Sequence, residues 1–210
     1  MRGGGKVLER GYLIAVEGID GAGKTVNSMW LVRRLRKSGY RAAYTKEPTE
    51  GPIGKVLRRS LARRGSNPEI DALLFAADRL HHIRTFIEPR LRQGFVVVTD
   101  RYLYSSIAYQ GALTGDRRWV ELVNRYCVPP DLAVYLDVDP STGLERKKRR
   151  RSDARAFEDP EVLRRVRAVY LELCAEGKMV MIPADRELRE VRAEIARVVG
   201  ERLGIEIRTG

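Results

Sequence analysis

One short segment near the start of the chain has the residue types and the spacing that bind phosphate. The pattern G-x-x-x-x-G-K-[ST] is matched at every fixed position by Gly18-Ile19-Asp20-Gly21-Ala22-Gly23-Lys24-Thr25. Glycines let backbone N–H groups converge on phosphate oxygens, the lysine reaches the β- and γ-phosphates, and the threonine hydroxyl can hold Mg²⁺. We predict a nucleotide site here, and we call these eight residues the phosphate loop.

A carboxylate at the end of an apolar run is the second candidate. Asp100 closes the segment 95–100, Phe-Val-Val-Val-Thr-Asp, in which apolar and β-branched residues are continuous. Such a run is typical of a strand that is buried on both faces of a parallel sheet and carries a functional residue at its C-terminal end. The segment resembles a Walker B strand.

Both candidates must be positioned by a sheet and its helices. The apolar run 12–16 leads into the phosphate loop, which opens a predicted helix over 25–37. Other strands are predicted near 41–45, 95–100, 132–136 and 179–182, and other helices over 53–63, 68–88, 105–112, 118–126, 160–175 and 188–203. Since strands alternate with helices, the sequence predicts an α/β fold with a parallel sheet wrapped on both sides.

Composition and length fit one cytoplasmic domain. The chain has 210 residues, of which 43% are hydrophobic, and no apolar run is long enough to span a bilayer. We expect residues 11–210 to form a single domain after a flexible arm over residues 1–10. Cys127 and Cys174 are expected to be reduced thiols, and His81 and His82 to be partly exposed helix residues without a role in metal binding.

The basic balance of the chain suggests anionic partners. Forty Lys and Arg residues against 28 Asp and Glu residues give a net charge of +12. The basic residues lie mainly on the polar sides of predicted helices, apart from one cluster over residues 146–151. They do not form the basic face interleaved with aromatic residues that polynucleotide binding requires, so nucleotides are the expected partners.

Three further segments make the reaction class more specific. They are Thr45-Lys46-Glu47-Pro48, the run 73–79 (Leu-Leu-Phe-Ala-Ala-Asp-Arg) and the run 100–111 (Asp-Arg-Tyr-Leu-Tyr-Ser-Ser-Ile-Ala-Tyr-Gln-Gly). Together with the phosphate loop they resemble the thymidylate kinase family, over residues 13 to 170. The resemblance implies a P-loop NTPase fold with a five-stranded parallel sheet, helices on both faces and a short basic lid over about 143–157. It also implies Mg²⁺-dependent transfer of the ATP γ-phosphoryl group to dTMP by a homodimer.

The resemblance assigns roles to individual residues. Asp100 would hold Mg²⁺ with Thr25, and Arg101 would bind the acceptor phosphate as a fork. Asp20 would reach the 3′-hydroxyl of the acceptor sugar. The remaining acceptor residues would be Phe75, stacked on thymine, Arg79 at the edge of the base, and Ser105, Ser106, Tyr109 and Gln110. The residue pattern by itself leaves a core role for Phe75 open.

The sequence departs from the family pattern at several positions. Val26-Asn27 stands where Thr or Ser and Gln are usual, and Lys46 stands where Arg is commoner. Some members carry an arginine at the position of Gly21, so the loop here brings a single cation, Lys24. We therefore predict that a lid arginine, Arg149 or Arg150, closes onto the phosphates, with Arg146 and Arg155 as further candidates.

Two other functions remain open at this point. A deoxynucleoside kinase also places an Asp-Arg segment after a phosphate loop, and it would need a base for a 5′-hydroxyl, a role that Glu17 could take. A nucleotide-dependent protein that binds polynucleotides would show steep salt dependence and no turnover of a monophosphate.

Overall fold

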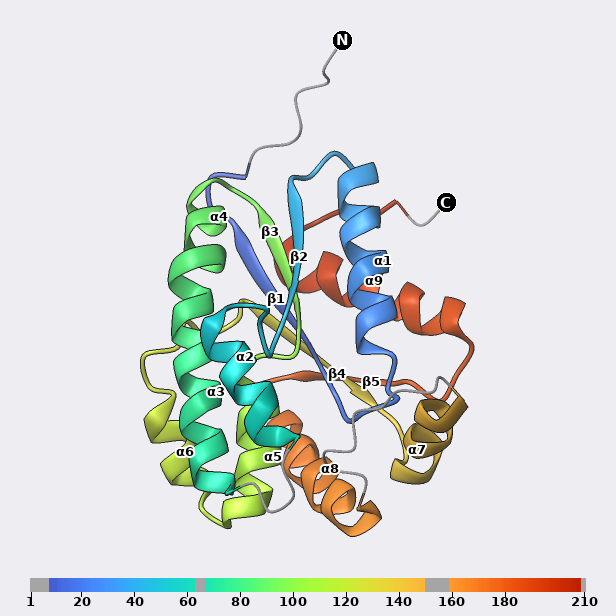
Figure 1. Cartoon of the computed structure of the whole chain (residues 1–210). Helices are drawn as coiled ribbons and strands as arrows, with labels where there is room; N and C mark the ends of the chain where they lie inside the picture. Colours follow the sequence, from blue (N-terminus) through green and yellow to red (C-terminus); the bar gives the residue numbers. More distant parts are fainter. Residues whose placement is uncertain (1–7, 63–66, 150–158, 209–210) are drawn as a thin grey trace.

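The computed structural model describes residues 8–62, 67–149 and 159–208, and it has the predicted α/β architecture. Five parallel strands form one sheet in the order β2-β3-β1-β4-β5 (Figure 1). They are β1 (Tyr12–Glu17), β2 (Ala42–Lys46), β3 (Val96–Asp100), β4 (Leu132–Asp137) and β5 (Val180–Pro183). Each strand lies within one or two residues of its predicted position.

Helices cover both faces of this sheet. On one face lie α1 (Lys24–Lys37) and α9 (Leu188–Leu203), which contact each other; on the other face α8 (Pro160–Ala175) packs against β4 and β5 (Figure 1). The remaining helices are α2 (Pro52–Leu61), α3 (Pro68–His82), α4 (Glu88–Arg92), α5 (Leu103–Thr114), α6 (Arg117–Val123) and α7 (Pro140–Arg149). The central strands are therefore shielded from water, and side chains of β1 and β3 such as Leu13 and Val98 are fully buried.

Strand register brings the chemically active segments to one edge. Val16 pairs with Asp100, and Asp100 also pairs with Lys46, so β1, β3 and β2 end side by side. Ligands of open α/β sheets bind outside the carboxyl ends of the strands. The phosphate loop, Asp100 and the loop after β2 consequently surround one crevice.

The long helix predicted from residue 68 begins and ends for identifiable reasons. The Asn67 side chain caps α3 by accepting from Ile70 N at 3.0 Å. A proline at position 89 predicts that the helix bends or restarts there, because its ring clashes with the carbonyl of Thr85 in α-helical geometry. The structure contains a wider π-helical turn there, η1 (Ile83–Ile87), in which Glu88 N donates to Ile83 O.

Part of the predicted N-terminal arm, residues 8–10, is described. Leu8 packs against the core, and Arg10 Nη1 lies 2.9 Å from Asp131 Oδ1. Residues 1–7 lie outside the described part of the chain.

Candidate active site

The phosphate loop joins β1 to α1 and has the backbone that its glycines permit. The φ angle is +147° at Gly18, +83° at Gly21 and +88° at Gly23. A Cβ atom on Gly21 would lie 2.1 Å from the carbonyl oxygen of Gly143, so the loop packs directly against α7. Loop residues from Asp20 to Thr25 line a cavity of about 590 Å³. The segment predicted to bind phosphate thus forms one wall of a cavity.

Lys24 is buried in this wall. It is 7% exposed, its Nζ donates to Ile19 O at 2.9 Å, and Asp20 Oδ1 lies 4.0 Å away. Burial lowers the pKa of Lys24 to about 8, and the positive charge of Arg101 adds to this shift. A polyphosphate beside Nζ would favour the charged ammonium, so the site is electrostatically suited to an anion.

Thr25 and Asp100 have the chemistry of a magnesium site. The Thr25 hydroxyl donates a short hydrogen bond to Asp100 Oδ2, and both residues line the cavity. Hydroxyl and carboxylate oxygens suit Mg²⁺, which takes one or two protein ligands and completes its shell with phosphates and water. Among the described residues, no group of three or more Asp, Glu, His or Cys side chains is arranged so that it could hold a metal ion. These two side chains fit the ion that the sequence predicts.

Three cationic side chains from different segments lie within 4.0 Å of the Asp20 carboxylate: Lys24, Arg101 and Lys147. Its Oδ1 lies 2.5 Å from Arg101 Nη2, and its Oδ2 lies 3.2 Å from Nζ of Lys147 in α7. Burial alone would raise the pKa of Asp20, but Arg101, Lys24 and Lys147 together hold it well below its usual value. The Asp20 carboxylate therefore carries a full negative charge between the phosphate loop, the end of β3 and α7.

Arg101 is held in an unusual conformation. It has φ +69°, the one positive φ outside glycine in the described part of the chain, and its N–H donates to Val16 O at 3.0 Å. Such backbone strain clusters at functional sites. The guanidinium lies 4.9 Å from the centre of the Tyr109 ring and donates to Ser105 Oγ at 3.1 Å. The turn after β3 thereby aims Arg101 at the cavity that it lines.

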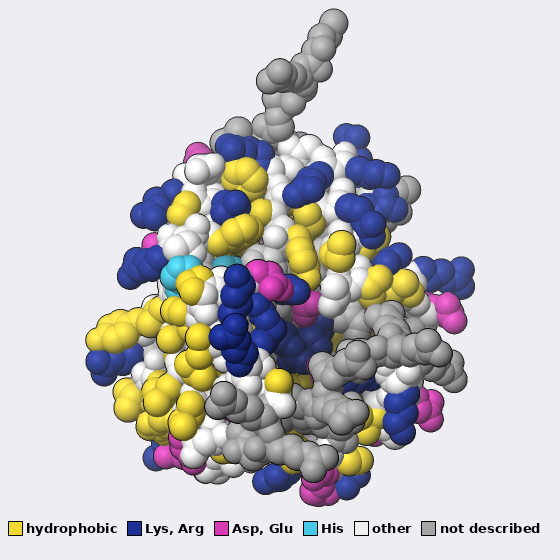
Figure 2. Space-filling model, viewed as in Figure 1, with side chains coloured by type: hydrophobic (Ala, Val, Ile, Leu, Met, Phe, Trp, Pro, Cys, Tyr) yellow, Lys and Arg dark blue, Asp and Glu magenta, His cyan; other side chains and the backbone are white. Residues whose placement is uncertain are grey.

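The cavity as a whole is basic. Figure 2 shows Lys and Arg side chains gathered around the hollow in the middle of the face viewed, with a carboxylate among them. Six cationic residues line it, Lys24, Lys46, Arg101, Arg146, Lys147 and Arg186, against three acidic ones, Asp20, Glu47 and Asp100. An excess of one sign of charge in a cleft raises the local concentration of an oppositely charged ligand. Nucleotide phosphates have that charge.

The predicted acceptor residues on α5 contact two arginines. Tyr109 OH accepts from Arg101 at 3.4 Å, and Ser106 Oγ accepts from Arg79 at 3.0 Å. Ser105 Oγ accepts from Arg101, donates to Glu17 and lies 3.0 Å from Tyr170 OH. Gln110 is 1% exposed, and its Nε2 has no hydrogen-bond partner among the described residues. A buried donor without a partner is costly, so Gln110 has the character of a ligand contact.

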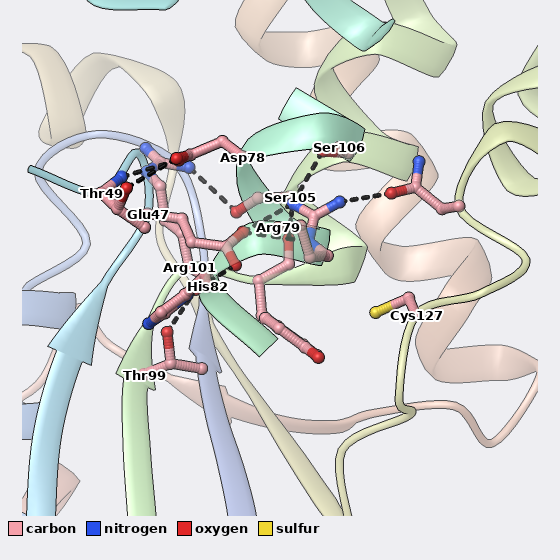
Figure 3. Close-up of polar contacts among 12 residues, drawn as sticks. Glu47, Thr49, Asp78, Arg79, His82, Thr99, Arg101, Ser105, Ser106 and Cys127 are labelled. Atoms are coloured by element: carbon pink, nitrogen blue, oxygen red, sulfur yellow. Dashed lines mark hydrogen bonds and ion pairs between the residues drawn. The ribbon is translucent and has the colours of Figure 1, made fainter. Parts of the chain in front are cut away.

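Phe75 and Arg79 lie one turn apart on α3, as the spacing predicts. Phe75 is half-buried and does not belong to the hydrophobic core cluster around the sheet. Arg79 is 1% exposed and bound to Glu47, Asn124 and Ser106 (Figure 3). Neither residue lines the 590 Å³ cavity.

One expectation about this helix is wrong. His82 was expected to be partly exposed, but it is 3% exposed. Both of its ring nitrogens have polar partners inside the protein, Glu47 Oε1 at 3.0 Å and Thr45 Oγ1 at 2.6 Å. Burial of the ring is therefore compatible with its polarity.

Glu17 does not have the surroundings of a general base. It is fully buried, and its carboxylate accepts from Tyr102 N at 3.1 Å and from Ser105 Oγ at 2.5 Å. Burial raises the pKa of Glu17. Both oxygens are occupied by the start of α5, and Glu17 does not line the cavity. Nothing in this geometry favours a deoxynucleoside kinase.

Comparison with known proteins agrees with the site. A family model described as thymidylate kinase matches residues 16–195. The chain belongs to the thymidylate kinase family. A protein of Pyrobaculum aerophilum named "Probable thymidylate kinase" is 43% identical over 187 residues, which are 89% of this chain and 95% of that one. A "Probable thymidylate kinase" of Staphylothermus marinus is 42% identical over 92% and 96% of the two chains. A "Thymidylate kinase" of Xanthomonas campestris is 40% identical over 93% and 87%.

Helix α7 brings a lysine into the site that sequence reasoning missed. Lys147 is 9% exposed and bonds to Asp20, whereas the expectation concerned arginines, first Arg149 and Arg150. The side chain of Arg149 and all of Arg150 and Arg155 lie outside the described part of the chain. Pro140, Gly143 and Lys147 follow one another at i, i+3 and i+7, and all three are buried. This helical spacing from Pro140, the first residue of α7, could have identified Lys147.

The far end of the cavity was also missed. Ala184 and Arg186 after β5 line it, together with Leu188 and Val191 of α9. These residues show no motif, and only the parallel fold brings them opposite the phosphate loop. Among the described residues, no helix has the length and apolarity that a membrane span requires.

Proposed function

We propose that this chain transfers the γ-phosphoryl group of ATP to dTMP and releases dTDP and ADP. The observation that carries the proposal is the convergence on Asp20. Lys24 from the phosphate loop, Arg101 from the turn after β3 and Lys147 from the lid lie within 4.0 Å of this one carboxylate. Several cations close to one point suit transfer between two phosphates, because catalysis of this reaction is mostly positioning and charge stabilisation.

The residues of the site divide into those that would bind the phosphoryl donor, ATP, and those that would bind the phosphoryl acceptor, dTMP. Lys24 and the backbone N–H groups of the phosphate loop would bind the β- and γ-phosphates of ATP. Arg101 would hold the acceptor phosphate, Asp20 would meet the acceptor sugar, and Gln110 would donate to the base. An acceptor phosphate is already nucleophilic, so no general base is needed, which agrees with the burial of Glu17.

Mg²⁺ is part of this proposal. Thr25 and Asp100 would hold the ion, which when bound neutralises charge on the phosphoryl group that is transferred. The chain's own contribution is to keep these two oxygens at the end of β3 next to Lys24, in the basic cavity described above.

We also propose that the protein acts as a homodimer. The family resemblance implies one, and five exposed apolar residues of α2, α3 and the α6 region are available for it: Val56, Ile70, Leu73, Leu122 and Tyr126. Figure 2 shows apolar side chains gathered at the lower left, where Figure 1 places α3 and α6. A second copy would cover this surface. The expectation of a cytoplasmic enzyme stays a prediction.

A coupled assay of ADP release separates the proposal from its rival. With ATP and Mg²⁺, dTMP should support turnover and thymidine should not, because the cations around Asp20 bind a phosphate and Glu17 cannot reach a hydroxyl. Turnover with thymidine but not with dTMP would establish a deoxynucleoside kinase instead.

A further inference from the structure

Three buried side chains form a continuous hydrogen-bonded chain that ends on Arg79. Glu47 Oε2 accepts from Arg79 Nε at 3.0 Å and from Nη2 at 2.7 Å, and Glu47 Oε1 lies 3.0 Å from His82 Nδ1. The three side chains are 1% to 4% exposed. Figure 3 shows Glu47 between the other two. One carboxylate from the loop after β2 thus joins two residues of α3.

The partners of His82 fix the orientation of its ring. Glu47 is a carboxylate paired with a guanidinium, and its oxygens only accept, so His82 Nδ1 must donate to it. On the other side, Nε2 lies 2.6 Å from Thr45 Oγ1, and the ring centre lies 5.7 Å from that of Phe86 in the π-helical turn. Because the ring is held on both sides, it also holds Glu47 Oε1 in place.

Glu47 in turn leaves Arg79 little freedom. A guanidinium has five N–H donors, and two of them bond to Glu47 Oε2. The second donor of Nη2 is shared by Tyr102 O and Ser106 Oγ, both at 3.0 Å, while Nη1 donates to Asn124 Oδ1 at 2.6 Å. Within the described residues this leaves one N–H, on Nη1, for a ligand. Its direction depends on the position of the carboxylate.

We propose that His82 is a positioning residue that acts through Glu47 on Arg79 and thereby selects thymine over cytosine in the acceptor. The inference rests on the proposed function. A fixed N–H group donates to the 4-carbonyl oxygen of thymine and opposes the 4-amino group of cytosine, which is itself a donor. Without His82, Glu47 Oε1 is a buried acceptor without its partner, and the carboxylate turns toward another donor. Arg79 turns with it, and the selection weakens.

Steady-state kinetics of three variants test this role. In His82→Ala we expect the KM for dTMP to rise about tenfold and the ratio of kcat/KM for dTMP to that for dCMP to fall about tenfold, as for the loss of one polar contact. The KM for ATP and kcat at saturating dTMP should stay within about twofold. His82→Asn places an amide N–H near the position of Nδ1 and should restore the ratio to within about threefold. His81→Ala, at the neighbouring histidine outside this network, is the matched control and should match the wild type.

Equilibrium binding of dTMP without ATP gives a readout that is independent of turnover. His82→Ala should weaken it about tenfold, and Thr45→Val, which removes only the partner of Nε2, should weaken it about threefold. If His82→Ala does not fold, Thr45→Val decides. An unchanged Kd for dTMP in the folded variants, or an equal loss in His81→Ala, would overturn the positioning role. Failure of the wild type itself to phosphorylate dTMP would instead overturn the proposed function.

Discussion

At the scale of single residues, the site depends on charges that are buried before any ligand binds. Lys24 is 7% exposed with a lowered pKa, while Asp20 keeps its charge because cations surround it. Desolvation penalises the ammonium, and three neighbouring cations stabilise the carboxylate. The site is therefore electrostatically suited to phosphate, and the balance between these groups should be visible in the pH dependence of activity.

The lowered pKa of Lys24 predicts how activity responds to alkaline pH. Below a pKa of about 8 the free enzyme carries the ammonium that attracts ATP, and above it that charge is lost. We expect kcat/KM for ATP to fall as pH rises through about 8, because this parameter reports the ionisation of the free enzyme. Bound phosphate favours the charged form, so kcat at saturating ATP should fall only at higher pH. A kcat/KM for ATP that stays flat to about pH 9.5 would contradict this, provided that circular dichroism shows a folded protein.

Substitution of Gln110 should weaken dTMP binding without lowering stability. Its buried Nε2 has no partner among the described residues, so Gln110→Leu removes an unsatisfied donor at similar volume. We expect the unfolding temperature to stay within about 2 °C or to rise, while the KM for dTMP rises about tenfold. Kinetics and thermal unfolding of the same preparation check both parts. A large loss of stability with an unchanged KM would make Gln110 a structural residue.

Residues with a motif could be predicted from the sequence, and residues without one could not. The phosphate loop and Asp100 are recognisable because their chemistry demands fixed neighbours: glycines at set spacing, and a carboxylate at the end of a buried strand. The buried contacts of His82 could not be predicted, because its partners Thr45 and Glu47 come from another segment more than 30 residues away. Only the folded sheet brings them together.

At the scale of elements, α7 packs directly against the phosphate loop. Gly143 approaches the loop so closely that a Cβ atom there would lie 2.6 Å from Asp20 O, and Lys147 one turn later bonds to the Asp20 side chain. A helix this close to the loop can respond to what the loop binds. The basic cluster of the sequence thus begins inside the site and continues past α7.

We expect Lys147 to act on the phosphates in the reacting complex. Lys147→Ala should lower kcat by about tenfold, or roughly 1.4 kcal/mol, with the KM for dTMP within about threefold. Lys148→Ala is the matched control, since Lys148 is exposed and adjacent. The same assay on Arg149→Ala and Arg150→Ala tests the expectation drawn from the sequence. If none of these variants lowers kcat, Arg101 must stabilise the transferred charge without help from the lid.

Elements were predictable where the pattern is local. Strand and helix positions follow from apolar periodicity, and Asn67-Pro68 marks a helix start that the structure confirms. The strand order and the contact between α1 and α9 depend on the whole fold. Pro89 predicted a bend but not its form, because the π-helical turn also requires the packing of Ile83 and Ile87, which are buried.

At the scale of the whole molecule, the basic cavity and the exposed apolar residues lie on different parts of the surface. The cations of the cavity face nucleotide phosphates, while exposed apolar residues of α2, α3 and the α6 region lie on a surface suited to a second copy. Apolar side chains gathered on an exposed surface are typical of interaction sites. The net charge of +12 is thus explained in part by the site and in part by solvated helix surfaces.

The proposed dimer predicts a change in mass on a single substitution. Leu73 is 51% exposed on α3, and Leu73→Glu would place a charge in the interface. Analytical ultracentrifugation should give twice the chain mass of 23.9 kDa for the wild type and the chain mass for the variant. Met29→Glu on α1, where Met29 is 46% exposed, should leave the dimer intact. A monomeric wild type would refute the dimer without affecting the site.

The most direct test of the central claim follows the phosphoryl group itself. When the enzyme is incubated with Mg²⁺, dTMP and ATP labelled at the γ-phosphate, we expect the label to appear in dTDP. Lys24→Ala and Arg101→Ala each remove a cation beside Asp20 Oδ1. Each should lower this transfer at least about a hundredfold while remaining folded. Label released as free phosphate, label absent from dTDP in the wild type, or full transfer by either variant would contradict it.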